Sequence, residues 1–426
     1  MPADLHHPLR LPCGVELPNR LLKSAMTEGL ADLADQATLR HATLYRRWSE
    51  GGTGTLITGN VMIDRRFLER PGNVVIEDKR GFDRLRRWAR AGTKSGNHLW
   101  MQISHPGRQC ARVSSRRPMA PSAIQLKLLG HFARPVAMRE EDIQDALDRF
   151  ARTAALAREA GFTGVQLHAA HGYLISEFLS ARLNRRKDDW GGPLASRARF
   201  LLEAVARTRQ AVGNDFPLAV KLNSADFQKG GFSFDESIQV AQWLEERGVD
   251  LVEISGGNYE QPTMFDMAGR REDADWPRRA STRQREAFFL DYAARLRREV
   301  RLPLAVTGGF RSRRVMREAL DSHALDVIGL ARPLVTEPDL SGRLLRGASA
   351  AAIRYEDRLH IGRGPFGPNS PLLFFKALNA LGPLAWYYRQ IIHLAENRMP
   401  HYRLGVLSAL VRHQVTERRL ARRRRR

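Results

Sequence analysis

The sequence predicts an α/β protein, a (β/α)8 TIM barrel with a C-terminal helical extension. Short runs of β-branched or aliphatic residues recur eight times in the first 345 of its 426 residues. Segments with helical period lie between most of these runs, and in 141–160 apolar side chains recur at positions 143, 147, 150, 154 and 157. Apolar strands alternating with amphipathic helices are typical of a helix-covered parallel sheet, and eight such units have the size of a closed barrel. An open, doubly wound sheet is the structural alternative.

The strands are expected at 21–26, 55–58, 98–104, 164–168, 217–222, 250–255, 303–307 and 326–330. Several of them end in a polar or glycine residue. In a barrel these ends meet at the C-terminal face, where such proteins place their chemistry. The segment 106–139 after the third strand is too long for an ordinary connection, so we expect it to form a lid or wall at this face. We expect the segment 256–285 to shape the same pocket.

The amino-acid composition excludes several classes of protein. The 69 Lys and Arg residues against 46 Asp and Glu give a formal charge of +23, while 43% hydrophobic residues is an ordinary globular value. Two cysteines, Cys13 and Cys110, are too few for a disulfide scaffold, a four-Cys zinc site or a protein-ligated iron–sulfur cluster. No secretory signal or membrane-spanning stretch is predicted. We therefore expect a cytoplasmic protein.

Three segments are expected: a barrel over 1–345, an amphipathic, mainly helical extension over 346–417, and a disordered Arg-rich tail over 418–426. Residues 346–426 carry 16 Arg or Lys against 4 Asp or Glu, which is about half of the net charge. We expect the helical pair to break near Gly382 and Pro383. It could pack on the barrel or at a subunit contact of a homo-oligomer, or it could dock at an anionic membrane, peripheral to its inner face.

The most informative motif is HAAHGYL, which follows the fourth strand. His168 and His171 lie three residues apart, with Tyr173 two residues further on. Two imidazole N–H groups could donate to one substrate oxygen, and Tyr173 has a proton to give. A two-histidine metal site is the alternative, but no H-E-x-x-H pattern or third carboxylate ligand accompanies the pair. We therefore expect no metal.

Together the motifs resemble those of a known family. HxxHGYL, the following SxxxNRRxDxWGG and the preceding QxxHxGR (Gln102, His105, Gly107, Arg108) are similar to motifs of the old yellow enzyme family of FMN-dependent ene-reductases. The resemblance covers roughly residues 9–345. It implies an FMN-containing barrel that takes a hydride from NADH or NADPH and passes it to an electron-poor small-molecule alkene.

The resemblance also implies which residues contact the flavin ring. Thr27 would donate to flavin O4, Gly59 would leave room for the ring, and Gln102 would pair with the pyrimidine edge. Lys221 would lie near N1 and O2, where a cation favours the anionic reduced flavin. The ring-side set is Ala25, Met26, Thr27, Gly59, Gln102 and Lys221.

The phosphate end is expected after the last two strands. Gly308 and Gly309 in TGGF are expected to open a helix, and Ala331 and Arg332 in GLARP follow the eighth strand. Glycines let backbone N–H groups approach a phosphate, a helix N-terminus favours an anion, and Arg332 can pair with its oxygens.

The implied catalytic residues are His168, His171 and Tyr173. The two histidines would hold and polarise the oxygen of an α,β-unsaturated substrate. Hydride would pass from flavin N5 to the β-carbon while Tyr173 protonates the α-carbon. Asn184 and Trp190 are expected to be structural, and His105 is left outside the catalytic set.

Two other function classes stay open. The basic composition suits an RNA-modifying FMN barrel resembling the dihydrouridine synthases. That family uses a cysteine as proton donor, whereas Cys110 falls in the loop after the third strand, so no nucleic acid is required. The third class is a membrane-associated binding protein led by the C-terminal extension.

Overall fold

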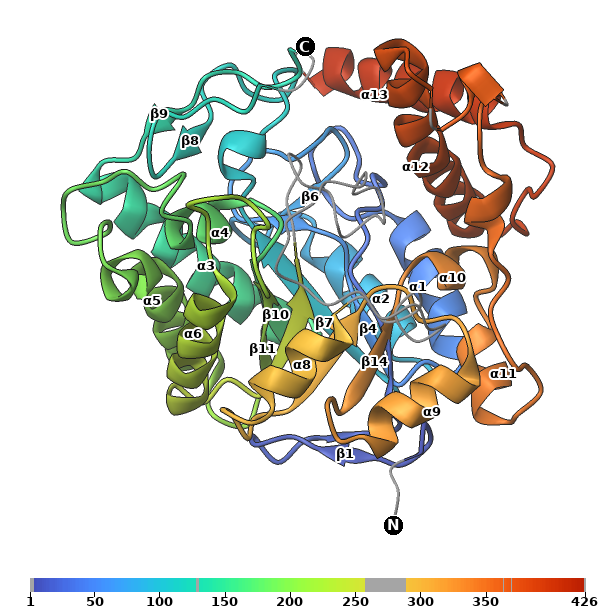
Figure 1. Cartoon of the computed structure of the whole chain (residues 1–426), viewed down its shortest axis with the longest axis horizontal. Helices are drawn as coiled ribbons and strands as arrows, with labels where there is room; N and C mark the ends of the chain where they lie inside the picture. The colour runs from blue at the N-terminus through green and yellow to red at the C-terminus, as the bar shows by residue number, and fades with distance from the viewer. Residues whose placement is uncertain (1–3, 128–129, 257–288, 363, 369, 425–426) are drawn as a thin grey trace.

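Eight parallel strands close into a barrel in the computed structural model, which describes residues 4–127, 130–256, 289–362, 364–368 and 370–424 (Figure 1). The strand order is β3, β4, β7, β10, β11, β12, β13, β14, and β14 pairs with β3 to complete the circle. The TIM barrel is confirmed, and the open-sheet alternative is wrong. The bounds are β3 Leu21–Lys23, β4 Thr55–Ile57, β7 His98–Ser104, β10 Gly164–Ala169, β11 Leu218–Asn223, β12 Leu251–Ser255, β13 Leu304–Thr307 and β14 Val327–Leu330.

Helices cover the outer face of the strands (Figure 1). The helix expected over 141–160 is α3, whose apolar stripe is buried through Ile143, Leu147 and Phe150. The long connection after β7 holds the short strands β8 (Met119–Ala120) and β9 (Val136–Ala137). The described helices are α1 Leu39–Glu50, α2 Phe82–Gly92, α3 Glu140–Glu159, α4 Leu174–Leu179, α5 Leu194–Val212, α6 Phe234–Glu246, α8 Leu290–Leu296, α9 Arg313–Asp321, α10 Arg332–Thr336 and α11 Leu340–Leu345.

The two ends of the barrel differ in polarity. At one end, a hairpin of β1 (Leu9–Arg10) and β2 (Glu16–Leu17) covers the barrel. Leu11 and Leu17 from this hairpin pack with inward-facing residues such as Trp100 in a separate apolar cluster. Apolar burial therefore closes this end, and the polar side chains collect at the carboxyl ends of the strands.

The C-terminal extension packs on the barrel. It consists of α12 (Leu373–Ala395) and α13 (Val406–Arg424), and α12 lies against α1 and α10. Trp386 is fully buried, and its indole N–H donates to the carbonyl of Leu404 at 2.9 Å. The hydroxyl of Tyr402 donates to the carbonyl of Thr336 at 2.8 Å. Of the placements expected from sequence, the structure shows packing on the barrel.

Two expectations for the extension are wrong. The helix α12 continues through Gly382 and Pro383, and the two helices separate only over 396–405. Proline removes one hydrogen bond, but the following residues, such as Trp386, are buried, so packing outweighs that loss. The tail is helical through Arg424, since arginine is a good helix former and Ala421 is buried. A Cβ at Gly382 would lie 2.5 Å from Val406, so glycine permits close contact between the helices.

No described helix combines the length and the hydropathy that crossing a bilayer requires.

Candidate active site

The three predicted catalytic residues lie together at the carboxyl end of β10. The ring centroids of His168 and His171 are 5.1 Å apart, and those of His168 and Tyr173 are 4.8 Å apart. His168 and Tyr173 are each 4% exposed, and His171 is partly buried. Since β10 ends at Ala169, one strand end and the turn after it supply all three rings.

Both histidines are neutral at pH 7. Burial, His171 and the charge of Lys221 lower the pKa of His168 well below its usual value, and burial and Lys221 together lower that of His171 to about 3. Nδ1 of His168 accepts the Ala170 N–H at 3.2 Å, which assigns the remaining proton to Nε2. Nε2 of His171 is 2.7 Å from Ser255 Oγ, so Nδ1 is its remaining nitrogen for a ligand. A pair of neutral imidazoles can polarise an oxygen without a net charge.

The backbone of His171 is held in an uncommon conformation. Its φ is +62°, a left-handed region that non-glycine residues rarely adopt. The His171 N–H donates to Asn223 Oδ1 at 3.1 Å, and Gln109 Nε2 donates to its carbonyl at 2.8 Å. One bond comes from the end of β11 and the other from the 3-10 turn after β7, and together they fix the turn that orients His171.

A buried ion pair lies beside the histidines. Lys221 Nζ on β11 is 2.9 Å from Glu253 Oε1 on β12, and the two side chains are 4% and 0% exposed. Glu253 also accepts hydrogen bonds from Ser24 and, at 2.7 Å, from Thr307. Burial raises the pKa of Glu253, but Lys221 and the hydroxyl donors outweigh it and bring the pKa to about 2. The charge of Lys221 is therefore balanced.

Glu253 was not predicted from the sequence, whereas Lys221 was. The available signal was a single carboxylate inside the apolar run of 251–254, which a strand buried on both faces does not otherwise tolerate.

A chain of amides runs from this ion pair to Gln102. Gln166 Nε2 donates to Glu253 Oε2 at 2.8 Å, and Gln102 Nε2 donates to Gln166 Oε1 at 2.7 Å. An ionised carboxylate only accepts hydrogen bonds, so Glu253 fixes the direction of both amides. Gln102 is left with its Oε1 unpaired among the described residues. One acceptor and the second Nε2 hydrogen therefore remain for a ligand edge.

Thr27 and Gly59 make contacts within the chain that the sequence did not indicate. The Thr27 hydroxyl donates to Glu69 Oε2 at 2.8 Å. Because a hydroxyl has a single proton, Thr27 can donate to flavin O4 only if it gives up its hydrogen bond to Glu69. A Cβ at Gly59 would lie 2.4 Å from the Met26 carbonyl, so this glycine lets the segment after β3 approach the end of β4. Ala25 and Met26 are partly buried against the core.

Lys23 forms a second buried cationic centre that the sequence did not indicate. Its Nζ donates to the Ile57 carbonyl at 2.7 Å and lies 4.5 Å from the Trp48 ring centroid. Burial lowers its pKa to about 7. The neighbouring Tyr45 hydroxyl donates to Glu28, which also accepts the Gly59 N–H at 2.8 Å. This network fixes the turn that carries Thr27.

The ends of β13 and β14 suit a phosphate. Gly308 and Gly309 have φ of +141° and +82°, so residues with a Cβ would be strained there. The Arg332 guanidinium makes no hydrogen bond or ion pair with any described residue, and Ala331 precedes it at the start of α10. The helix after TGGF begins at Arg313, later than expected. Two glycines with positive φ and an arginine without a partner among the described residues form a donor set that fits the phosphate of FMN.

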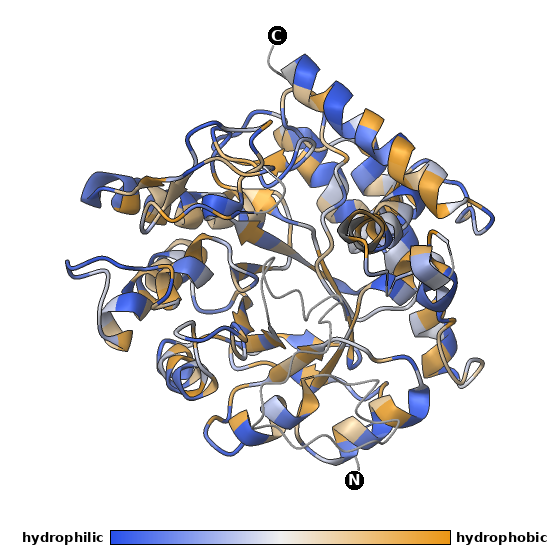
Figure 2. Cartoon of the chain, turned by 45° about the horizontal axis from the view of Figure 1, so that its top comes forward, coloured by the Kyte–Doolittle hydropathy of each residue, from blue (hydrophilic) through white to orange (hydrophobic). Residues whose placement is uncertain are grey.

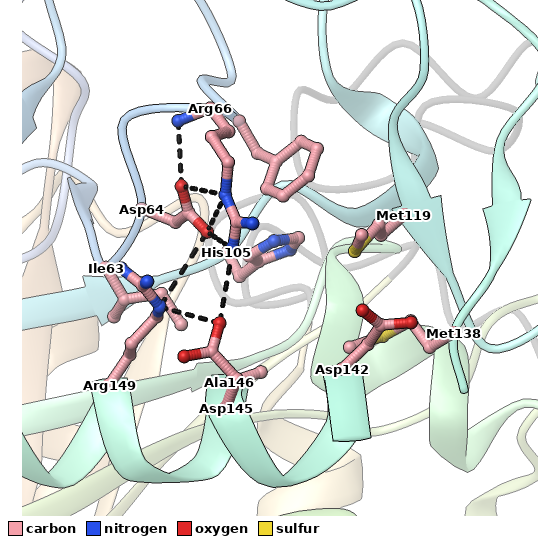
Figure 3. A pocket seen from close by; sticks show the side chains of 11 residues that line it. Ile63, Asp64, Arg66, His105, Met119, Met138, Asp142, Asp145, Ala146 and Arg149 are labelled. Carbon is pink, nitrogen blue, oxygen red and sulfur yellow. Dashed lines mark hydrogen bonds and ion pairs between the residues drawn. The ribbon is translucent and has the colours of Figure 1, made fainter. Parts of the chain in front are cut away.

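His105 lies in a small pocket outside this group (Figure 3). Burial lowers its pKa to about 4, and its Nδ1 accepts the Gly107 N–H at 3.1 Å. Figure 3 shows the ion pairs beside it, in which Arg66 contacts Asp64 at 2.6 Å and Asp145 at 3.1 Å. These charges pair with one another, which supports leaving His105 outside the catalytic set.

Asn184 has the structural role expected of it, because its amide donates to the carbonyls of Phe178 at 2.8 Å and Trp190 at 2.7 Å. Of the segment 256–285, all but its first residue lies outside the described residues. Among the described residues, no cluster of three or more His, Cys, Asp and Glu is arranged to hold a metal ion.

Comparison with known proteins gives the family. Residues 4–350 match the NADH:flavin oxidoreductase / NADH oxidase family. The chain belongs to this family. The resemblance to old yellow enzymes is thereby confirmed, as is the enzyme class of oxidoreductase.

Relatives from fungi share about a third of their residues with the chain. It is 34% identical to the NADH-dependent flavin oxidoreductase iliE of Hypocrea jecorina, over 79% of the chain and 88% of that protein. It is 36% identical to iccE of Talaromyces variabilis, over 92% of the chain and 99% of that protein, so this similarity reaches beyond the matched barrel into the extension. The iliE protein of a Neonectria species is 36% identical over 79% of the chain, which spans 46% of that protein.

Among solved structures, the old yellow enzyme homologue from Zymomonas mobilis has a TM-score of 0.69 and 26% identity, covering 87% of this chain and all of that one. Morphinone reductase, at 20% identity, shares the fold with a TM-score of 0.67 over 82% of this chain and 91% of its own.

Proposed function

We propose that the protein is an FMN-dependent oxidoreductase that uses NADH to reduce the C=C bond of electron-poor alkenes such as α,β-unsaturated carbonyls. The observation that carries this proposal is the group of His168, His171 and Tyr173 at one strand end, with both imidazoles neutral. The fungal relatives named as NADH-dependent support NADH over NADPH as the hydride donor.

The chain offers a separate contact for each part of the cofactor. Gly308, Gly309 and Arg332 would hold the phosphate, and the free amide edge of Gln102 and the paired Lys221 would face the ring system. When bound, FMN supplies the capacity to accept and pass on a hydride. The barrel residues position it and set the charge around it.

The histidines and Tyr173 act on the substrate. His168 donates from Nε2 to the substrate oxygen, and His171 presents Nδ1 to the same region. Because neither imidazole is charged, they withdraw electron density from the carbonyl without attracting competing anions. Tyr173 delivers its hydroxyl proton to the α-carbon. The hydride would thus come from the cofactor and the proton from Tyr173.

Anaerobic kinetics of the purified protein test this proposal. The protein should be yellow, release FMN on denaturation, be reduced by NADH, and then be reoxidised by a cyclic enone with formation of the saturated ketone. A saturated alcohol from the same ketone serves as the control and should not reoxidise it. A colourless protein that takes up no added FMN would refute the proposal.

We further propose that α13 contacts an anionic membrane surface. Leu407, Val411 and Val415 recur every four residues and are 55%, 56% and 42% exposed, and Figure 2 shows hydrophobic and hydrophilic residues along this helix. Such a face, with arginines towards its end, is typical of interfacial helices. Co-sedimentation with anionic vesicles should fall for Val411→Glu and stay absent with neutral vesicles. Equal sedimentation of variant and wild type would rule out this contact.

A further inference from the structure

The C-terminal helices reach the loop after β5 (Val61–Met62) through one buried arginine. Arg70 is 9% exposed, and its Nη2 lies 2.6 Å from Glu417 Oε1 on α13 and 3.1 Å from Nε2 of His413. Its guanidinium lies 3.8 Å from the ring centroid of Tyr388 on α12. Burial and the neighbouring arginines lower the pKa of His413 to about 3, so this neutral ring accepts from Arg70. Both helices of the extension therefore hold the same side chain.

The residue before Arg70 holds the turn that carries Thr27. Glu69 Oε2 accepts from the Thr27 hydroxyl at 2.8 Å and from Asn60 Nδ2 at 2.7 Å. Arg70 follows Glu69 directly in the chain. The Arg70 N–H donates to Asn73 Oδ1 at 2.9 Å, and Asn73 Nδ2 donates to the Asn60 carbonyl at 3.3 Å. A backbone bond of 3.1 Å from the Ala31 N–H to the Gly72 carbonyl joins the same two segments. The segment 69–73 thus lies between the extension and the turn after β3.

From this geometry we propose that the C-terminal helical pair is a positioning element of the flavin site, acting through Arg70 and Glu69 on Thr27. Glu417, His413 and Tyr388 fix Arg70, which belongs to the same short loop as Glu69. Glu69 holds the Thr27 hydroxyl. The family resemblance implies that Thr27 lies beside the flavin of the proposed function, on which this inference rests. The extension then influences the cofactor without touching it.

The charge of Arg70 determines in which direction the reduction potential of bound FMN should change. Without it, the loop that holds Thr27 loses a positive charge and Glu417 loses its partner, so the surroundings of the proposed flavin site become more negative. Since the ring gains negative charge on reduction, reduction becomes less favourable. The reduction potential of bound FMN should therefore shift to a more negative value in Arg70→Met. It should return towards the wild-type value in Arg70→Lys, which keeps the charge. A role in folding alone would not make the potential follow the charge.

Hydrogen exchange of the protein without FMN tests the positioning itself. Glu417→Ala keeps a good helix former on α13 and removes the ion pair to Arg70. Loss of a charged hydrogen bond should speed exchange of the Ala31 amide by about tenfold. The matched control is Glu396→Gln, which removes a carboxylate from the end of α12 whose ion pair with Arg398 is exposed. The control should leave this amide unchanged.

The outcomes separate the two proposals. Unchanged exchange at Ala31 in Glu417→Ala, or an unchanged potential in Arg70→Met, would overturn the positioning role. A wild-type protein that binds no FMN would instead contradict the proposed function, and the exchange measurement would still decide whether the extension fixes this turn.

Discussion

Replacing Glu253 by glutamine should destabilise the protein strongly, because it leaves the Lys221 ammonium buried without a counter-charge. The pKa of Glu253 falls from 4.5 to about 2 on folding, which corresponds to about 3 kcal/mol of stability at pH 7. Removing one partner of a buried pair costs about 3–5 kcal/mol, which agrees. The free energy of urea unfolding at pH 7 measures the loss. A lowered carboxyl pKa stabilises the folded state above pH 4.5, and this stabilisation is lost as the pH falls towards 2. The difference in unfolding free energy between wild type and variant should therefore become smaller in acid.

A double-mutant cycle with Lys221→Met distinguishes the ion pair from simple packing. The double variant removes both buried charges, so its loss should be smaller than the sum of the single losses by more than about 1 kcal/mol. Ser24→Ala, which removes one hydrogen bond to Glu253, is the control and should cost about 1 kcal/mol. A loss below 1 kcal/mol for Glu253→Gln, or strict additivity, would refute the reasoning.

Three further outcomes follow from the site. Tyr173→Phe should slow reoxidation by an enone about 10²–10⁴-fold while reduction by NADH is unchanged, and full alkene reduction would exclude Tyr173 as the proton donor. His168→Ala should lower the rate with an enone about 10²–10³-fold through loss of a donor to the substrate oxygen; an unchanged rate would contradict that contact. Burial raises the pKa of Glu177 to about 8, so the folded state retains a proton that the unfolded state loses above about pH 4.5. Wild-type stability should therefore fall by up to about 1.4 kcal/mol per pH unit from this group between pH 5 and 8, and Glu177→Gln should remove that slope in urea unfolding; equal slopes would show that Glu177 is ionised.

The barrel and its main site motif were predictable because each depends on local sequence. The strand 98–104 has the bounds of β7, since a mainly apolar run between polar residues leaves little freedom in where the strand begins and ends. His168, His171 and Tyr173 meet because they lie within six consecutive residues of one strand end and turn. Contacts between residues that are close in the sequence can therefore be predicted from the sequence.

The polar interior of the barrel was not predictable in the same way. Gln102 and Gln166 are 64 residues apart, and Lys221 and Glu253 are 32 apart, so their contacts depend on strand pairing and register. Arg70 and Glu417 are separated by 347 residues. A single polar residue inside an apolar run gives no sign of its partner. Burial against the barrel likewise overrode the local helix-breaking tendency of Pro383.

The left-handed backbone at His171 bears on how this site can change over evolutionary time. Besides glycine, asparagine is among the residues that adopt that conformation most readily, and its amide still offers a hydrogen-bond donor. Histidine and asparagine codons differ by a single base. A lineage can therefore exchange an imidazole for an amide here in one mutational step without rebuilding the turn, and so alter substrate preference while the barrel stays as it is.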